Sequence, residues 1–91
     1  MAIVAPAAVT VTTTSTLVFT ATTGSANLAQ TVVLSCPAGN TVDVLVGGTA
    51  AGALFPIAPG GSLAIDCRKG DEIYADCSAG TETLNIIYNM V

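Results

Sequence analysis

The sequence contains no histidine and no tryptophan, and it carries little charge of either sign. Of its 91 residues, 9% are charged, compared with about 25% in an average globular domain. Catalysis near neutral pH normally uses a histidine, a nucleophile beside a base, or two carboxylates with unequal pKa values. Because no such set can be recognised, we expect no catalytic residues and no enzymatic activity.

Basic side chains are almost absent. Arg68 and Lys69 are the only two, against six acidic residues, which gives a net charge of −4. Proteins that bind nucleic acid gain most of their affinity from cationic contacts to phosphates. The sequence therefore predicts no nucleic acid partner.

Long apolar runs are also missing. The first 42 residues are uncharged, but Pro6, Pro37 and many threonines interrupt them. The sequence therefore has no run of about 20 apolar residues, the length that a membrane-spanning helix needs. The first residues include no basic side chain, unlike the start of a secretory signal peptide. We expect no membrane partner and a chain that is made in the cytoplasm.

The three cysteines are an odd number, and without histidine they do not form a recognisable zinc site. Cys36, Cys67 and Cys77 are interpreted as buried thiols that act as small apolar side chains, with one disulfide plus one free thiol as the alternative. The acidic residues of the C-terminal third lack the spacing of a calcium loop. The glycine-rich residues 46–52 lack the lysine of a phosphate-binding loop. We therefore predict no metal and no cofactor.

Strand-forming residues dominate the chain. Glutamate, lysine, glutamine and arginine total five residues, whereas thirteen threonines favour extended backbone. Turn sequences rich in glycine recur about every 8 to 12 residues. Between them, apolar and polar residues alternate with a period of two over residues 10–22, 41–47, 62–67, 72–77 and 82–89. This pattern predicts an all-β fold, a small antiparallel β-sandwich or jelly-roll-like domain.

The alternation and the turns also predict local pairing. Residues 66–72 are expected to form a hairpin through Gly70, with Ile65 and Ile73 in the core. A second hairpin is expected between residues 41–47 and the short apolar run 53–57. The threonine-rich residues 10–23 are long for one strand, and two strands joined near residues 14–16 are the simplest interpretation.

The N-terminal residues 1–16 have two alternative roles. They form either an extended arm that pairs with a neighbouring subunit or an edge strand of the β-sandwich domain that residues 17–91 make up. Their uncharged, strand-prone side chains make them candidates for contact with a partner, together with two glycine loops. The interface candidates are Val4, Val9, Val11, Thr12, Thr14, Gly48 and Gly60.

Residues 42–88 contain, in order, a strand that ends in VGG, a PGGS turn, the run GDEIYA and a SAGT turn. These features resemble small virion proteins of tailed bacteriophages. The resemblance implies a capsid decoration (cement) protein, or a related head-fibre or tail module, that lies on the capsid exterior. It implies contact with the major capsid protein or another virion protein, and self-association as a small oligomer, expected to be a homotrimer.

Low charge and abundant threonine, alanine and valine describe a surface that is mostly interface, in agreement with the resemblance. We therefore predict a phage virion structural protein that binds the head shell and stabilises it by burying apolar and threonine-rich β surface. The alternative is a carbohydrate- or receptor-binding β-module of a tail fibre or a secreted protein. A cluster of Tyr74, Tyr88 and acidic side chains on one exposed face would favour that alternative.

Overall fold

The computed structural model describes residues 2–22, 29–48 and 55–90 of the chain. Within these ranges the chain forms eight strands and no helix, so this part holds no helix that could cross a membrane. The strands are β1 (Ala2–Val11), β2 (Thr16–Thr20), β3 (Gln30–Ser35), β4 (Val44–Gly47), β5 (Phe55–Ile57), β6 (Ser62–Cys67), β7 (Glu72–Cys77) and β8 (Glu82–Met90). The prediction of an all-β fold is confirmed.

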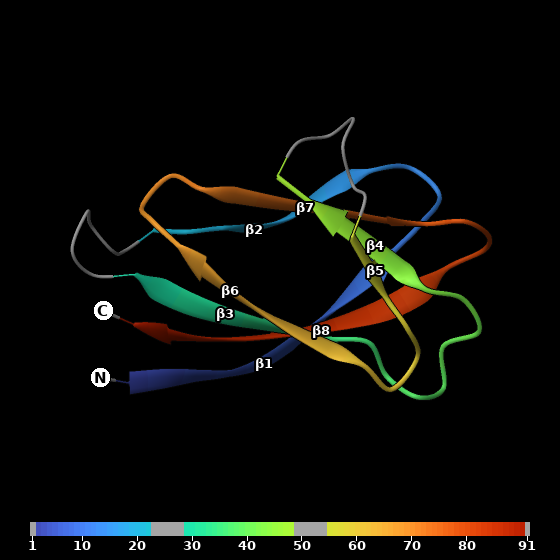
Figure 1. Cartoon of the computed structure of the whole chain (residues 1–91), viewed down its shortest axis with the longest axis horizontal. Coiled ribbons are helices and arrows are strands. Elements are labelled where there is room, and N and C mark those ends of the chain that lie inside the picture. The colour runs from blue at the N-terminus through green and yellow to red at the C-terminus, as the bar shows by residue number, and fades with distance from the viewer. Residues whose placement is uncertain (1, 23–28, 49–54, 91) are drawn as a thin grey trace.

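The strands form two antiparallel four-stranded sheets that pack against each other (Figure 1). The strand order is β1-β8-β3-β6 in the first sheet and β2-β7-β4-β5 in the second. The pairs β1·β8, β2·β7, β3·β6 and β4·β5 join strands that are about equally far from the middle of the chain. The chain is therefore one long hairpin folded over into two layers, which is the jelly-roll arrangement of a β-sandwich.

The core lies between the two sheets. Most of its residues come from the inward-facing positions of the strands, where side chains alternate between the core and the outer face, and Ala21 and Cys36 directly follow β2 and β3. Among the described residues, the buried apolar side chains are Val11, Ala21, Val32, Leu34, Cys36, Val44, Val46, Ile57, Cys67, Ile73, Ala75, Cys77, Leu84 and Ile86. The inward rows predicted for residues 41–47, 62–67, 72–77 and 82–89 are confirmed, although some of their residues are half-buried: Val42, Leu63, Ile65 and Tyr88. The alternation predicted over residues 10–22 does not form one inward row, because the chain turns at residues 12–15 and Leu17 is exposed.

Strand β3 is absent from the five predicted segments, although it lies between β8 and β6 inside the first sheet. Its burial alternates strictly, with Gln30, Val32 and Leu34 buried. Two residues hide this alternation in the sequence. Gln30 is a polar residue at a buried position, and Val33 is an apolar residue at an outward one.

The hairpin predicted over residues 66–72 is wrong. Strand β6 belongs to the first sheet and β7 to the second, so residues 68–71 carry the chain from one layer to the other. The predicted tight turn itself exists: the N–H of Asp71 donates to the carbonyl oxygen of Arg68 at 2.9 Å, and Gly70 has φ +94°. Ala21 fixes this turn by a backbone hydrogen bond to each of Gly70 and Asp71. The same tight turn can join two paired strands in a hairpin or two strands of different sheets in a crossover. The strands with which β6 and β7 pair determine which connection forms.

Two other predicted connections agree with the structure. Strands β4 and β5 pair antiparallel, with Val44 opposite Ile57 and Val46 opposite Phe55, as predicted for the second hairpin. The loop between them, residues 49–54, lies outside the described residues. The threonine-rich segment divides into β1 and β2, and the N–H of Thr14 donates to Oγ1 of Thr12 in the turn between them.

The N-terminal residues pair with the C-terminal strand of the same chain. Strand β1 runs antiparallel to β8 from Ala2, opposite Met90, to Val11, opposite Glu82 (Figure 1). The register shifts between Val4 and Ala7, around Pro6, and proline in a sheet is found at such irregular edge positions. Of the two roles considered for residues 1–16, this pairing has the geometry of an edge strand.

Candidate functional site

The structure does not bring the interface candidates together. Val11 is buried in the domain's own core, so its assignment as an interface residue is corrected: it faces inward on the alternating strand β1. Val9 is half-buried against the same core, whereas the side chain of Val4 lies outside the described set. Thr12 and Thr14 lie in the β1–β2 turn. Gly48 and Gly60 are exposed in two other loops.

The outer face of the first sheet is almost free of charge. We call it the neutral face, because Asp66 is the one charged residue among its described outward positions. Thr31 joins three strands there: its N–H donates to Oδ1 of Asn89 at 2.6 Å, and its hydroxyl donates to Oδ1 of Asp66 at 2.9 Å. The neutral face consists of Ala8, Thr10, Thr31, Val33, Ser35, Ser62, Ala64, Asp66, Thr83, Asn85, Ile87 and Asn89.

The outer face of the second sheet differs from the neutral face in charge. Glu72 and Asp76 of β7 lie on it, beside the half-buried Leu45 of β4. A register shift between Leu17 and Phe19 in β2 leaves the side chain of Leu17 42% exposed. This face therefore combines apolar and acidic side chains.

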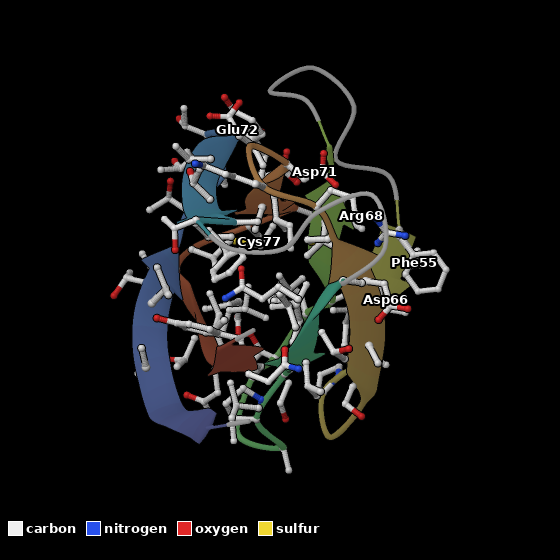
Figure 2. The ribbon with its side chains drawn as sticks, turned by 90° about the vertical axis from the view of Figure 1, so that its left-hand side faces the viewer. Phe55, Asp66, Arg68, Asp71, Glu72 and Cys77 are labelled. Atoms are coloured by element: carbon white, nitrogen blue, oxygen red, sulfur yellow. The ribbon has the colours of Figure 1, made fainter. Side chains whose placement is uncertain are left out.

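A groove of about 450 Å³ opens where β6 of the first sheet approaches β4 and β5 of the second. The side chain of Phe55 is 55% exposed beside it. In Figure 2 the Phe55 ring points away from the ribbon, near Asp66. Asp71 and Glu72, which also line the groove, lie higher in the same view. The residues that line the groove are Val46, Gly47, Gly48, Phe55, Leu63, Ile65, Asp66, Cys67, Asp71, Glu72 and Ile73.

Three acidic residues of the C-terminal third lie in two separate places. Asp71 and Glu72 line the groove, but Glu82 is buried elsewhere and accepts hydrogen bonds from the N–H and hydroxyl of Thr41, at 3.1 and 2.8 Å. The described residues contain no group of three histidine, cysteine, aspartate or glutamate side chains that could hold a metal ion.

The two tyrosines do not form a cluster. Tyr88 of β8 packs inward against Phe19 of β2 with the ring centroids 5.0 Å apart. Tyr74 of β7 alternates with the buried Ile73 and Ala75, so it lies on the outer face of the second sheet. The aromatic surface that would favour a carbohydrate-binding role is not formed by this pair.

The three cysteines are buried and free of disulfide bonds. Burial raises the pKa of the Cys67 thiol, and the negative charges of Asp71 and Asp66 raise it further. Burial also raises the pKa of Cys77, which a hydrogen bond to the backbone of Ala79 partly offsets. Both thiols are therefore poor nucleophiles at neutral pH.

We expect the native Cys67 and Cys77 thiols to react with a disulfide reagent at pH 8 at least about 100-fold more slowly than in the urea-unfolded chain, because both thiolate formation and access are suppressed. The raised pKa values predict that the native rate still increases as the pH rises above the ordinary range of a thiol. Spectrophotometric titration of the released reagent measures both rates. Rapid modification of Cys67 or Cys77 in the folded chain would contradict the burial.

Comparison of the chain with protein-family models, curated proteins and solved structures finds no match.

Proposed function

We propose that this chain is a phage virion structural protein, a capsid decoration (cement) protein that binds the outside of the head shell as a small oligomer. The neutral face carries this proposal. The chain has six acidic residues, yet the outer face of a four-stranded sheet includes one of them among its described residues. Uncharged β surface of this extent is typical of a contact with another protein.

The size of the neutral face fits a small specific contact. The Cα atoms extend over 38 × 25 × 16 Å, and in Figure 2 the two sheets lie one above the other, with the four strands of each sheet side by side along the shortest direction. One outer face of about 38 × 16 Å therefore covers roughly 600 Å², which matches the about 600 Å² that each partner buries in the smaller specific interfaces. Separating shell subunits held by such contacts requires exposure of this area to water, and in that way the protein would reinforce the shell.

The partners in this proposal are the major capsid protein, or another virion protein, and further copies of the chain as an expected trimer. The location is the capsid exterior. The proposal assigns the chain no enzymatic activity and no contact with nucleic acid or membrane. The resemblance of residues 42–88 to tailed-phage virion proteins supports it. The jelly roll supports it by association, because viral capsid proteins use this architecture, but lectins and cupins use it as well.

Binding to empty head shells tests the proposal. We expect the purified chain to co-sediment with the shells, and its affinity to change little between about 50 and 500 mM salt, because uncharged contacts are not screened. Mass spectrometry of purified particles should detect many copies. Failure of the wild-type chain to bind shells would show that the proposal is wrong.

Two lysine substitutions form a matched pair that locates the contact. Ile87 of β8 and Leu45 of β4 are half-buried, outward-facing aliphatic residues on inner strands of opposite sheets. Ile87→Lys should weaken shell binding by about tenfold or more, because it places an unpaired charge in the contact. Leu45→Lys should bind as the wild type does. The reverse result would move the contact to the second sheet.

A further inference from the structure

Three of the four edge strands carry features that discourage pairing with another chain. The edge strand β1 has the register shift around Pro6, and β2 has the shift between Leu17 and Phe19. The third, β5, has three residues, one of which is Pro56. Irregular register, proline and short length are the usual protections of a sheet edge.

Strand β6 has none of these protections. Its six residues pair with β3 in an unbroken register and include no proline and no lysine. It ends the first sheet, and no described strand pairs with its other side. Strand β6 is therefore an open edge of normal strand length, to which another strand can add.

The register shows which main-chain groups this edge offers. The N–H of Cys36 donates to the carbonyl oxygen of Gly61 at 2.9 Å. In an antiparallel pair the hydrogen-bonded positions alternate, so Leu63, Ile65 and Cys67 direct their main-chain groups toward β3. The N–H and C=O groups of Ser62, Ala64 and Asp66 then point away from the sheet.

The groove lies along the same edge. Leu63 and Ile65 are half-buried on the inward side of β6, and Phe55 stands exposed across from them on β5. A strand added to β6 would place alternate side chains on these apolar residues. The side chains between them would lie on the outer side, next to Ala64 and Asp66.

Charge identifies the chemistry of the partner. Asp66, Asp71 and Glu72 surround the groove, and no described residue forms an ion pair with them. The two basic residues of the chain, Arg68 and Lys69, lie in the turn beyond the end of β6. A cationic side chain is therefore favoured opposite Asp66, whereas a second copy of this chain has no basic residue in any strand and would bring a net charge of −4.

We propose that β6 and its groove bind an extended segment of another protein as an added strand. The segment presents aliphatic side chains to Phe55, Leu63 and Ile65, and a lysine or arginine to Asp66. Main-chain hydrogen bonds to Ser62, Ala64 and Asp66 supply affinity, and the pattern of alternate side chains supplies specificity. This interaction is additional to shell binding. It can be tested on the purified chain in the absence of shells, so its outcome is separate from that of the shell-binding experiment.

Two synthetic peptides test the proposal. Acetylated and amidated Thr-Val-Lys-Val-Thr and Thr-Val-Glu-Val-Thr have the same alternation and differ in the charge at the outward position. In NMR titrations of the labelled chain, the lysine peptide should shift the amide signals of Ser62, Ala64 and Asp66, and should bind about tenfold or more tightly than the glutamate peptide. Equal binding of the two peptides, or shifts confined to other strands, would overturn the proposal.

Substitutions at position 64 test the added-strand geometry. Ala64→Pro removes an N–H that points away from β3, so proline is tolerable there, as at other edge positions. Ala64→Thr is its control, because it keeps the N–H and favours a strand. The proline variant should lose peptide binding and the threonine variant should keep it. A folded proline variant that binds the lysine peptide as the wild type does would refute strand addition.

Asp66→Lys provides a test that does not require proline in the strand. The side chain of Asp66 is exposed, and the variant should reverse the preference, so that the glutamate peptide binds more tightly than the lysine peptide. An unchanged preference would show that Asp66 does not select the partner. Sedimentation of the chain without peptide tests whether a second copy of the chain occupies the β6 edge instead. A dimer that the Ala64→Pro substitution abolishes would assign the edge to that second copy and overturn the proposal.

Discussion

The Leu34→Ala variant is expected to lose about 2 to 5 kcal/mol of its free energy of unfolding. Leu34 is fully buried in β3, a strand that lies between β8 and β6 inside the first sheet. Its removal leaves a cavity between the sheets, and neighbouring strands on both sides limit how far the site can close. Because a domain of this size has about 5 to 15 kcal/mol in total, the loss takes a large part of the stability.

Urea unfolding followed by circular dichroism measures this loss, and Val33→Ala is the control. Val33 is the next residue on the same strand, but it lies half-buried on the outer face. We expect its loss to be clearly smaller than that of Leu34→Ala. Ile65→Ala should also lose less, because Ile65 is half-buried beside the groove rather than enclosed. A loss below about 0.5 kcal/mol for Leu34→Ala is the range of surface changes and would show that the faces of β3 are reversed.

The local features of this fold can be predicted from the sequence because they depend on neighbouring residues. The alternation of Ile73, Ala75 and Cys77 with polar residues identifies the inward face of β7 without knowledge of its partner. Gly70 likewise predicts a tight turn, because its positive φ belongs to that residue. These expectations agree with the structure.

Strand pairing depends on residues that are distant in the chain, and here the prediction from sequence is wrong. Strands β6 and β7 flank a turn suited to a hairpin, but β6 pairs with β3 and β7 with β2 and β4. Backbone hydrogen-bonding groups are the same in every strand, so the turn alone does not select the partner. Which strands pair depends on how the inward faces of the two complete sheets fit together. The sequence of one local segment does not contain that information.

The groove could not be predicted for the same reason. It brings together β5 from one sheet and β6 from the other, and the side chain of Phe55 is exposed beside it. The signal available in the sequence is Pro56, which marks β5 as an edge strand. For Val11 a signal was also present, because Val9 and Val11 alternate with Ala8 and Thr10, and this alternation makes Val11 a core residue rather than a contact for a partner.

The Gln30→Met variant is expected to raise the free energy of unfolding by about 1 to 3 kcal/mol. Gln30 is completely buried at the start of β3, opposite Cys67 of β6, and neither Oε1 nor Nε2 of its side chain has a hydrogen-bond partner among the described residues. On folding, this amide gives up its hydration and gains no hydrogen bond from the described residues in return. Methionine has a similar length and volume, carries no strong polar group, and adapts its shape to the site.

Gln30→Ala separates the removal of the polar group from the filling of the space. Both substitutions remove the unpaired amide, but alanine also leaves a cavity, so it should be less stable than Gln30→Met by about 2 kcal/mol or more. Urea unfolding of the three proteins provides the comparison. If an ordered water bonds to the Gln30 amide in solution, the methionine variant loses that bonding and is destabilised instead. A fall in stability for Gln30→Met would therefore show that this amide is satisfied by solvent and that its burial is a structural requirement of β3.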